Sequence, residues 1–196
     1  MGSFYVNVTV LDVGLDAVRT AAPRPSFVGA AGTDPIVYAA ADDAGAPVVG
    51  AALTDALGCT GISVGVHDDD ILFWEVHRAG ETIVSGAVPD PAEVFGLGDG
   101  EMAEMMEMMG DMPDAGAAEE PEGSGDLAAD LVAALGRGDV QALGDALAAD
   151  HTFATDRHVA FVDALGLPRA AVGWGYRYIE AAGGEDELLG PVEHLT

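Results

Sequence analysis

The sequence contains no lysine, only one cysteine and no long apolar run. Because Cys59 has no second cysteine to pair with, an internal disulfide and a cysteine-built zinc site are both excluded. No run approaches the roughly 20 apolar residues that a membrane-spanning helix needs. The first residues also lack the basic start and apolar core of a signal peptide. We therefore expect a soluble, cytoplasmic protein that has no membrane partner.

Charge is strongly one-sided, since 34 acidic residues face seven arginines and the formal net charge is −27. Acids are concentrated in Asp68–Asp70 and in the stretch from Asp99 to Glu122. The screening length falls from roughly 8 Å at physiological salt to roughly 3 Å at 1 M, so molar salt makes such clusters tolerable. The composition indicates a halophilic, salt-rich cytoplasm, or alternatively a high-GC genome that replaces lysine with arginine. In either case, direct binding to nucleic acid is disfavoured by repulsion.

Apolar periodicity predicts an α+β fold in residues 1–88. Alternation in residues 4–10 predicts a half-buried strand, and a short helix over 15–22 follows it. Further strands are expected over 26–31, 36–41, 62–67, 71–78 and 81–88, with a helix that ends at Gly58. This β-α-β-β then α-β-β-β order favours a mixed or mainly antiparallel sheet with both helices on one face.

The remaining residues divide into three segments. Residues 89–125 combine a methionine-rich acidic helix with a Pro, Gly, Ala and Glu linker. Residues 126–183 are predicted to form three helices that begin near Asp126, Asp139 and Thr155, and then a last strand over 172–179. We expect this helical segment to pack on the sheet domain, and residues 184–196 to fray.

Two stretches, GISVGVHDDDILFWEVHRAGETIV (61–84) and RHVAFVDALGLPRAAVGWGYRYIE (157–180), resemble segments of an uncharacterised family of predicted prokaryotic α+β proteins. No function is attached to that family. The resemblance implies only that the two halves of the chain form one unit.

Two clusters of histidine and aspartate are the candidate catalytic groups. The first consists of His67, Asp69 and Asp70, whose imidazole and carboxylates are types that can bind a divalent metal. An acidic hairpin turn is the alternative interpretation, because neighbouring side chains in a strand or turn splay apart. The second cluster consists of His151 and His158, which lie too far apart on one helix to share a zinc ion directly. We therefore predict no metal site.

Two further patterns are candidate binding sites. Met102, Met105, Met106 and Met109 follow helical spacing and form an apolar stripe suited to packing, to partner binding or self-association, or to Cu(I). The second pattern lies in residues 173–178, where two glycines flank a tryptophan and allow another backbone or a ligand to approach. Its candidate binding residues are Trp174, Tyr176 and Arg177.

The sequence contains no G-x-S-x-G, H-E-x-x-H or P-loop motif, and we expect no cofactor. The leading hypothesis is therefore a non-catalytic binding or protein-interaction module. A metal-dependent hydrolase that uses the His/Asp clusters is one alternative. The other is a mimic of nucleic-acid charge, which would present an ordered acidic stripe to a basic partner.

Overall fold

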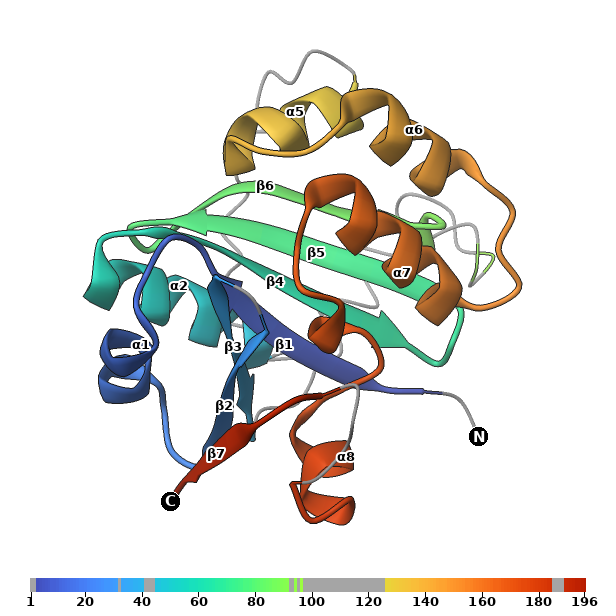
Figure 1. Cartoon of the computed structure of the whole chain (residues 1–196). Helices are drawn as coiled ribbons and strands as arrows, with labels where there is room; N and C mark the ends of the chain where they lie inside the picture. Colours follow the sequence, from blue (N-terminus) through green and yellow to red (C-terminus); the bar gives the residue numbers. More distant parts are fainter. Residues whose placement is uncertain are drawn as a thin grey trace.

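Seven strands form a single antiparallel sheet in the computed structural model of this chain (Figure 1). The structure describes residues 3–31, 33–40, 45–91, 94, 96, 126–184 and 189–196. The strand order across the sheet is β6-β5-β4-β1-β3-β2-β7. The strands are β1 (Tyr5–Val10), β2 (Ser26–Ala31), β3 (Asp34–Ala39), β4 (Thr60–His67), β5 (Ile71–Arg78), β6 (Glu81–Val88) and β7 (Val192–Leu195).

The first four strands and two helices have the connectivity of a ferredoxin-like split β-α-β arrangement. Helix α1 (Leu15–Ala21) joins β1 to β2, and α2 (Gly45–Leu57) joins β3 to β4. Their sheet order, β4-β1-β3-β2, inserts β3 between the parallel strands β1 and β2. Strands β5 and β6 then extend the sheet beyond β4, and β7 extends it beyond β2. The predicted α+β class with a mainly antiparallel sheet is thus confirmed.

A second helical layer covers the opposite face of the sheet. It contains α5 (Leu127–Leu135), α6 (Val140–Ala148) and α7 (Ala154–Leu165), followed by the short turn η1 (Arg169–Ala171) and helix α8 (Tyr176–Ala181). In Figure 1 α7 crosses in front of the sheet, with α5 and α6 at the top and α8 at the bottom, while α1 and α2 lie together at the left. Among the described helices, none combines the length and apolar character needed to cross a membrane.

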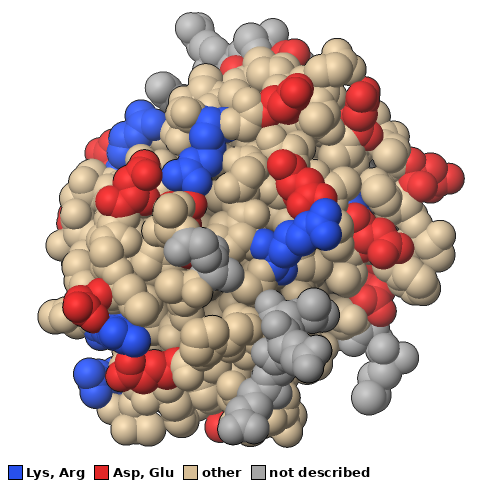
Figure 2. Space-filling model, viewed as in Figure 1, with Lys and Arg blue, Asp and Glu red and all other residues tan. Residues whose placement is uncertain are grey.

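Charged residues are dispersed over the face that this second layer forms (Figure 2). Two arginines form ion pairs close in sequence: Arg19 of α1 is 2.9 Å from Asp16, and Arg169 of η1 pairs with Asp163. The acids that are visible on this face do not line up as one stripe.

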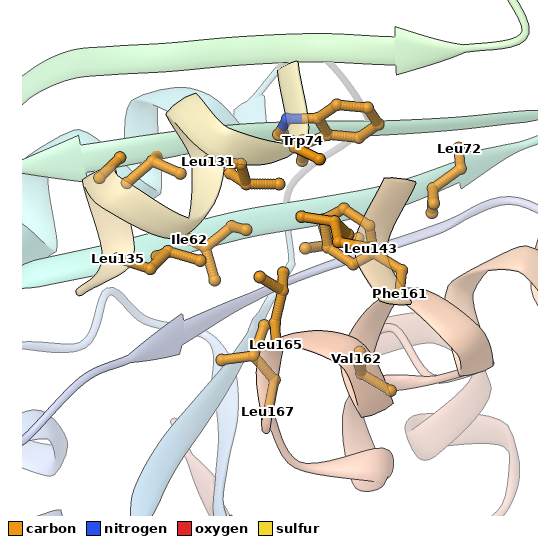
Figure 3. Close-up of a cluster of buried hydrophobic side chains, with 14 of the residues drawn as sticks. Ile62, Leu72, Trp74, Leu131, Leu135, Leu143, Phe161, Val162, Leu165 and Leu167 are labelled. Carbon is orange, nitrogen blue, oxygen red and sulfur yellow. The ribbon is translucent and has the colours of Figure 1, made fainter. Parts of the chain in front are cut away.

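The largest apolar cluster lies between the sheet and helices α5–α7 (Figure 3). Trp74 of β5 contacts Phe161 of α7, with ring centroids 5.2 Å apart, and both side chains are buried. A smaller cluster on the other face joins Val8 and Val10 to α1 and α2. Strand β1 is consequently buried on both faces, so the prediction of a half-buried strand was wrong. The reason is that the C-terminal helices cover the face that carries Tyr5, Asn7 and Thr9.

The predicted capping residues are correct at some helix ends of the second layer and wrong at one. Asp126 and Asp139 each accept a hydrogen bond from the backbone three residues on, and Gly136 and Gly166 end their helices in the left-handed conformation. The predicted Thr155 cap was wrong, because α7 begins at Ala154 after Phe153.

The last strand is not where the sequence pattern placed it. Residues 172–179 do not form a strand, because Gly173 has a φ of 78° and the chain then enters α8. The strand is instead β7, which lies in the segment expected to fray and pairs with β2 from Val192 to Leu195. Its partner precedes it by more than 160 residues, a relation that no local pattern encodes.

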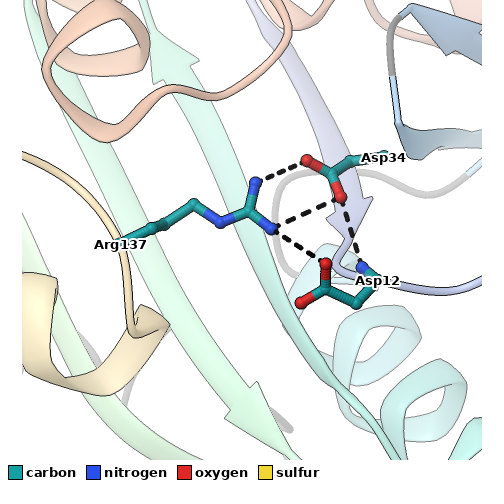
Figure 4. Close-up of polar contacts among 3 residues, drawn as sticks. All are labelled: Asp12, Asp34 and Arg137. Carbon is teal, nitrogen blue, oxygen red and sulfur yellow. Dashed lines mark hydrogen bonds and ion pairs between the residues drawn. The ribbon is translucent and has the colours of Figure 1, made fainter.

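A polar clamp ties the helical layer to the far end of the sheet (Figure 4). Arg137, in the loop between α5 and α6, is 2.6 Å from the Asp34 carboxylate and 3.5 Å from that of Asp12. The Asp34 side chain is only 3% exposed, whereas that of Asp12 is 88% exposed. The Asp34 contact is thus a nearly buried ion pair, while the Asp12 contact is a surface one.

Candidate functional site

Exposed aromatic side chains gather at the end of the sheet where β1 begins and β4 ends. Phe4, Phe153 and Tyr178 are 44%, 52% and 37% exposed, whereas most large apolar side chains of the described residues are buried. With His67 they form what we call the aromatic rim. Its members come from four segments: the approach to β1, the end of β4, the start of α7 and helix α8.

Direct contacts hold one half of the rim together. The Phe4 ring meets the His67 ring edge-on, with centroids 4.8 Å apart and planes at 86°. The Phe4 backbone N–H donates to the Tyr178 hydroxyl at 3.1 Å. The exposed rings are therefore fixed by neighbouring elements and do not sit on a free chain end.

The β4–β5 turn connects this half of the rim to Phe153. Asp68 and Asp69 adopt φ values of 51° and 64°, the left-handed region that aspartate tolerates better than most residues. The Asp69 backbone then bridges two segments: its N–H donates to the Ser3 carbonyl at 3.4 Å, and its carbonyl accepts from Ala154 N–H at 2.6 Å. Phe153, which immediately precedes Ala154, is thereby held beside the turn.

Two neutral polar side chains lie directly beneath the rim. Tyr5 Oη and His158 Nδ1 share a hydrogen bond of 2.8 Å, and both side chains are buried. Burial raises the pKa of Tyr5 to about 12 and lowers the pKa of His158 to about 3. Neither group changes charge near neutral pH, so the pair is a rigid floor for the rim and not an acid–base couple.

The segments that carry the two predicted His/Asp clusters lie next to each other, but their histidine side chains do not point toward one another. The turn with Asp69 and Asp70 is bonded to the start of α7, which places residues 67–70 next to residues 151–158. His67 contacts Phe4, however, while His158 points inward to Tyr5. The described residues contain no group of three or more His, Cys, Asp or Glu side chains that could hold a metal ion.

The predicted aromatic binding residues mainly serve packing. Trp174 and Tyr176 pack against a buried cluster built on Phe27, and Arg177 is exposed. A Cβ added to Gly175 would lie 2.9 Å from that of Tyr5, so the glycine is needed for close approach to β1. The backbone that approaches Gly175 is that of β1 in the same chain, whereas a Cβ added to Gly173 would meet nothing within 4 Å. The four stripe methionines, Met102, Met105, Met106 and Met109, lie outside the described residues.

A third polar network, which no sequence motif marks, lies under α2 on the other face of the sheet. Ser63 Oγ is 3.0 Å from His77 Nε2, and His77 Nδ1 is 3.1 Å from Thr82 Oγ1. Thr82 in turn donates to Glu75 at 3.3 Å. Because Thr82 gives its proton to Glu75, it accepts from Nδ1–H, which leaves Nε2 of the neutral ring free to accept from Ser63. Only the pairing of β4 with β5 and β6 brings these residues together.

Ser63, His77 and Glu75 follow the order of a nucleophile, a base and an acid, but the serine and the histidine are inaccessible to solvent. Ser63 is 2% exposed and His77 is fully buried. A Cβ placed on Gly50 of α2 would overlap Ser63 Oγ and lie 2.6 Å from the His77 ring. Burial also lowers the pKa of His77 to about 4 and raises the pKa of Glu75. No substrate can reach the serine in this packing, so the network stabilises α2 on the sheet.

Fold and surface together define an α+β protein whose antiparallel sheet contains a split β-α-β arrangement and which carries an exposed aromatic rim. No protein-family model, curated protein or solved structure matches the chain.

Proposed function

We propose that this protein is a non-catalytic interaction module that binds a protein partner through the aromatic rim. The observation that carries the proposal is the exposure of Phe4, Phe153 and Tyr178 at one end of the sheet. Aromatic side chains are enriched among the residues that dominate binding energy at protein interfaces. Exposing three of them in one place has no benefit for folding.

Pre-organisation supports the same function. The Phe4 backbone is bonded to Tyr178, and Asp69 joins the N-terminal segment to the start of α7. A partner that binds the rim therefore does not have to order these elements, which reduces the entropic cost of association.

The surroundings of the rim indicate the chemistry of the partner. Asp68 and Asp70 are exposed in the turn that separates His67 from the start of α7. A segment that combines large apolar side chains with arginine or lysine would complement both the rings and the acids. In a salt-rich cytoplasm, one of the two settings that the composition allows, the acids would contribute mainly to specificity, since screening weakens long-range attraction.

Selection from a displayed peptide library, followed by affinity measurement, tests the proposal. Peptides enriched on the wild-type protein should pair apolar with basic residues and should lose at least tenfold in affinity for the double variant Phe4→Ala/Phe153→Ala. Val48→Ala is the matched control, because Val48 is 53% exposed on α2, on the other face of the sheet. Enriched peptides that bind the rim variant as tightly as the wild type would refute the proposal.

The methionine stripe stays a separate prediction for partner binding or self-association. A chain that lacks residues 99–125 separates the two hypotheses. Binding through the rim should survive this deletion, whereas binding through the stripe should not.

A further inference from the structure

The two edges of the sheet differ in length and in charge. The edge strand β7 has four residues and carries Glu193 and His194. The other edge strand, β6, has eight residues, and its only charged residue is Glu81 at the first position. Within the described part of the chain, β6 pairs with β5 alone. A long, uncharged edge presents unpaired N–H and C=O groups and can pair with another strand. The carbonyl of Val88, at the end of β6, is an exception because it accepts a hydrogen bond from Arg157 at 3.1 Å.

A bulge defines which part of β6 is regular. Val84 lies opposite Val76 and Thr82 opposite His77, so Ile83 is the extra residue. From Val84 to Val88 the pairing with β5 is continuous, and Gly86 is at its centre. No residue of β6 is buried, in contrast to β1, where all six are. Side chains at this edge thus keep exposed area that a further strand could cover.

We propose that the edge of β6 pairs antiparallel with β6 of a second copy of this chain, with the two-fold axis at Gly86. Such an axis requires residues of the same sheet face to be opposite each other. Gly86 would then face Gly86 of the second copy, and Val84 would face Val88. This surface is distinct from the aromatic rim and does not depend on the function proposed for the rim.

Charge favours a second copy over a basic partner. The chain carries 34 acidic residues, yet the stretch Val84–Val88 has none. A basic ligand would be drawn to the acidic surfaces and not to this edge. In the antiparallel register, the two Glu81 residues lie ten positions apart along the paired strands, roughly 33 Å at about 3.3 Å per residue, beyond the screening length even at physiological salt. The same register places Glu81 beside Asp90 of the second copy, so the paired stretch Val84–Val88 is uncharged while its ends repel, and this repulsion is screened at high salt.

Salt dependence follows from the same argument. Pairing of five residues provides few main-chain hydrogen bonds, so we expect a dissociation constant on the order of 100 µM in 2 M KCl. At 0.15 M KCl, repulsion between the two chains, each of net charge −27, should weaken the dimer at least tenfold. The expected dimer has twice the chain mass of 19.9 kDa.

Sedimentation equilibrium of the full chain at both salt concentrations tests the proposal. The double variant Ser85→Glu/Ala87→Glu places like charges opposite each other and should be monomeric in 2 M KCl. Val140→Glu is the control, because Val140 is 39% exposed on α6 and is not part of the edge strand, and this variant should dimerise like the wild type. Circular dichroism verifies that both variants are folded.

A register-specific experiment complements the mass measurement. In a Cys59→Ser background, Ser85→Cys mixed with Ala87→Cys should form an interchain disulfide faster than either variant alone, because these positions face each other across the axis. A wild-type chain that stays monomeric at several hundred micromolar in 2 M KCl would overturn the proposal. So would a dimer that the double glutamate variant leaves intact, since that dimer would use another surface.

Discussion

Substitution of Gly50 by alanine is the most direct test of the packing between α2 and the sheet. Gly50 is buried in the middle of α2, and an added Cβ would lie 2.6 Å from two atoms of the His77 ring and overlap Ser63 Oγ. Neither neighbour is free to move, because His77 is held between Ser63 at 3.0 Å and Thr82 at 3.1 Å. The methyl group therefore either displaces α2 or breaks this network.

The expected magnitude combines three effects. Alanine gains about 1 kcal/mol over glycine in a helix interior. Overpacking costs roughly 1–3 kcal/mol. Leaving a buried polar group of the network unsatisfied costs about 1–3 kcal/mol more. The net expectation is a loss of about 3 kcal/mol in the free energy of unfolding for Gly50→Ala.

A second helical glycine provides the control. Gly144 lies within α6, and its added Cβ would meet only the Ala128 Cβ at 4.0 Å, an ordinary van der Waals contact. Gly144→Ala should therefore stabilise the protein by about 0.5–1 kcal/mol, the opposite sign.

Urea denaturation followed by circular dichroism, at one fixed KCl concentration, measures both variants. In a Ser63→Ala background part of the overlap is removed, so Gly50→Ala should cost at least about 1 kcal/mol less than it does in the wild type. If Gly50→Ala is as stable as the wild-type protein, or if its cost does not change in the Ser63→Ala background, the packing argument is wrong.

Three further predictions concern charge. Arg137→Ala removes the cation from the nearly buried Asp34 carboxylate and should lower the free energy of unfolding, measured by urea denaturation, by about 3 kcal/mol. Asp12→Asn changes the exposed contact and should lower it by less than about 0.5 kcal/mol. Equal losses for the two variants would contradict the importance of the buried ion pair. Burial lowers the pKa of His77 to about 4 and that of His158 to about 3, so both contribute stability above pH 6.5 that is lost as pH falls toward 4. His77→Gln should flatten this loss when urea midpoints are compared from pH 7.5 to 4.5, and an unchanged slope would refute the assignment. Finally, the melting temperature of the wild type should rise between 0.1 and 2 M KCl, and a flat or falling curve would argue against salt adaptation.

The elements that the sequence predicts well are those fixed by neighbouring residues. Alternation and capping are local, so every strand and helix through residue 88 was found at nearly its observed bounds. The Asp126 and Asp139 caps and the Gly136 and Gly166 ends are likewise set within one helical turn.

Relations between distant residues could not be predicted in this way. Tyr5, Asn7 and Thr9 look like the solvent face of a strand until the C-terminal helices cover them. Aromatic residues in 172–179 are typical of a strand, yet the close approach of Gly175 to β1 and the turn at Gly173 lead into a helix instead.

The candidate site shows the same limit. His67, Asp69 and His158 were selected for their chemistry, and the fold does bring their segments together. Their orientation, which decides whether they can react, depends on Phe4 and Tyr5 and is visible only in three dimensions. Exposure of Phe153 is equally hidden, since the sequence pattern marks an aromatic residue as core.

The second helical layer explains why binding surfaces should lie at the ends and edges of this sheet. A split β-α-β sheet with both helices on one face leaves its other face bare. Here α5–α7 bury that face in the largest apolar cluster. The Arg137–Asp34 ion pair and the Tyr5–His158 hydrogen bond connect this helical layer to the sheet at opposite ends. A partner cannot use the sheet face without displacing Trp74 and Phe161 from each other, which would cost several kcal/mol. Among the described residues, the rim, where the helical layer meets the start of β1, and the edge strand β6 are surfaces that remain accessible without such a cost.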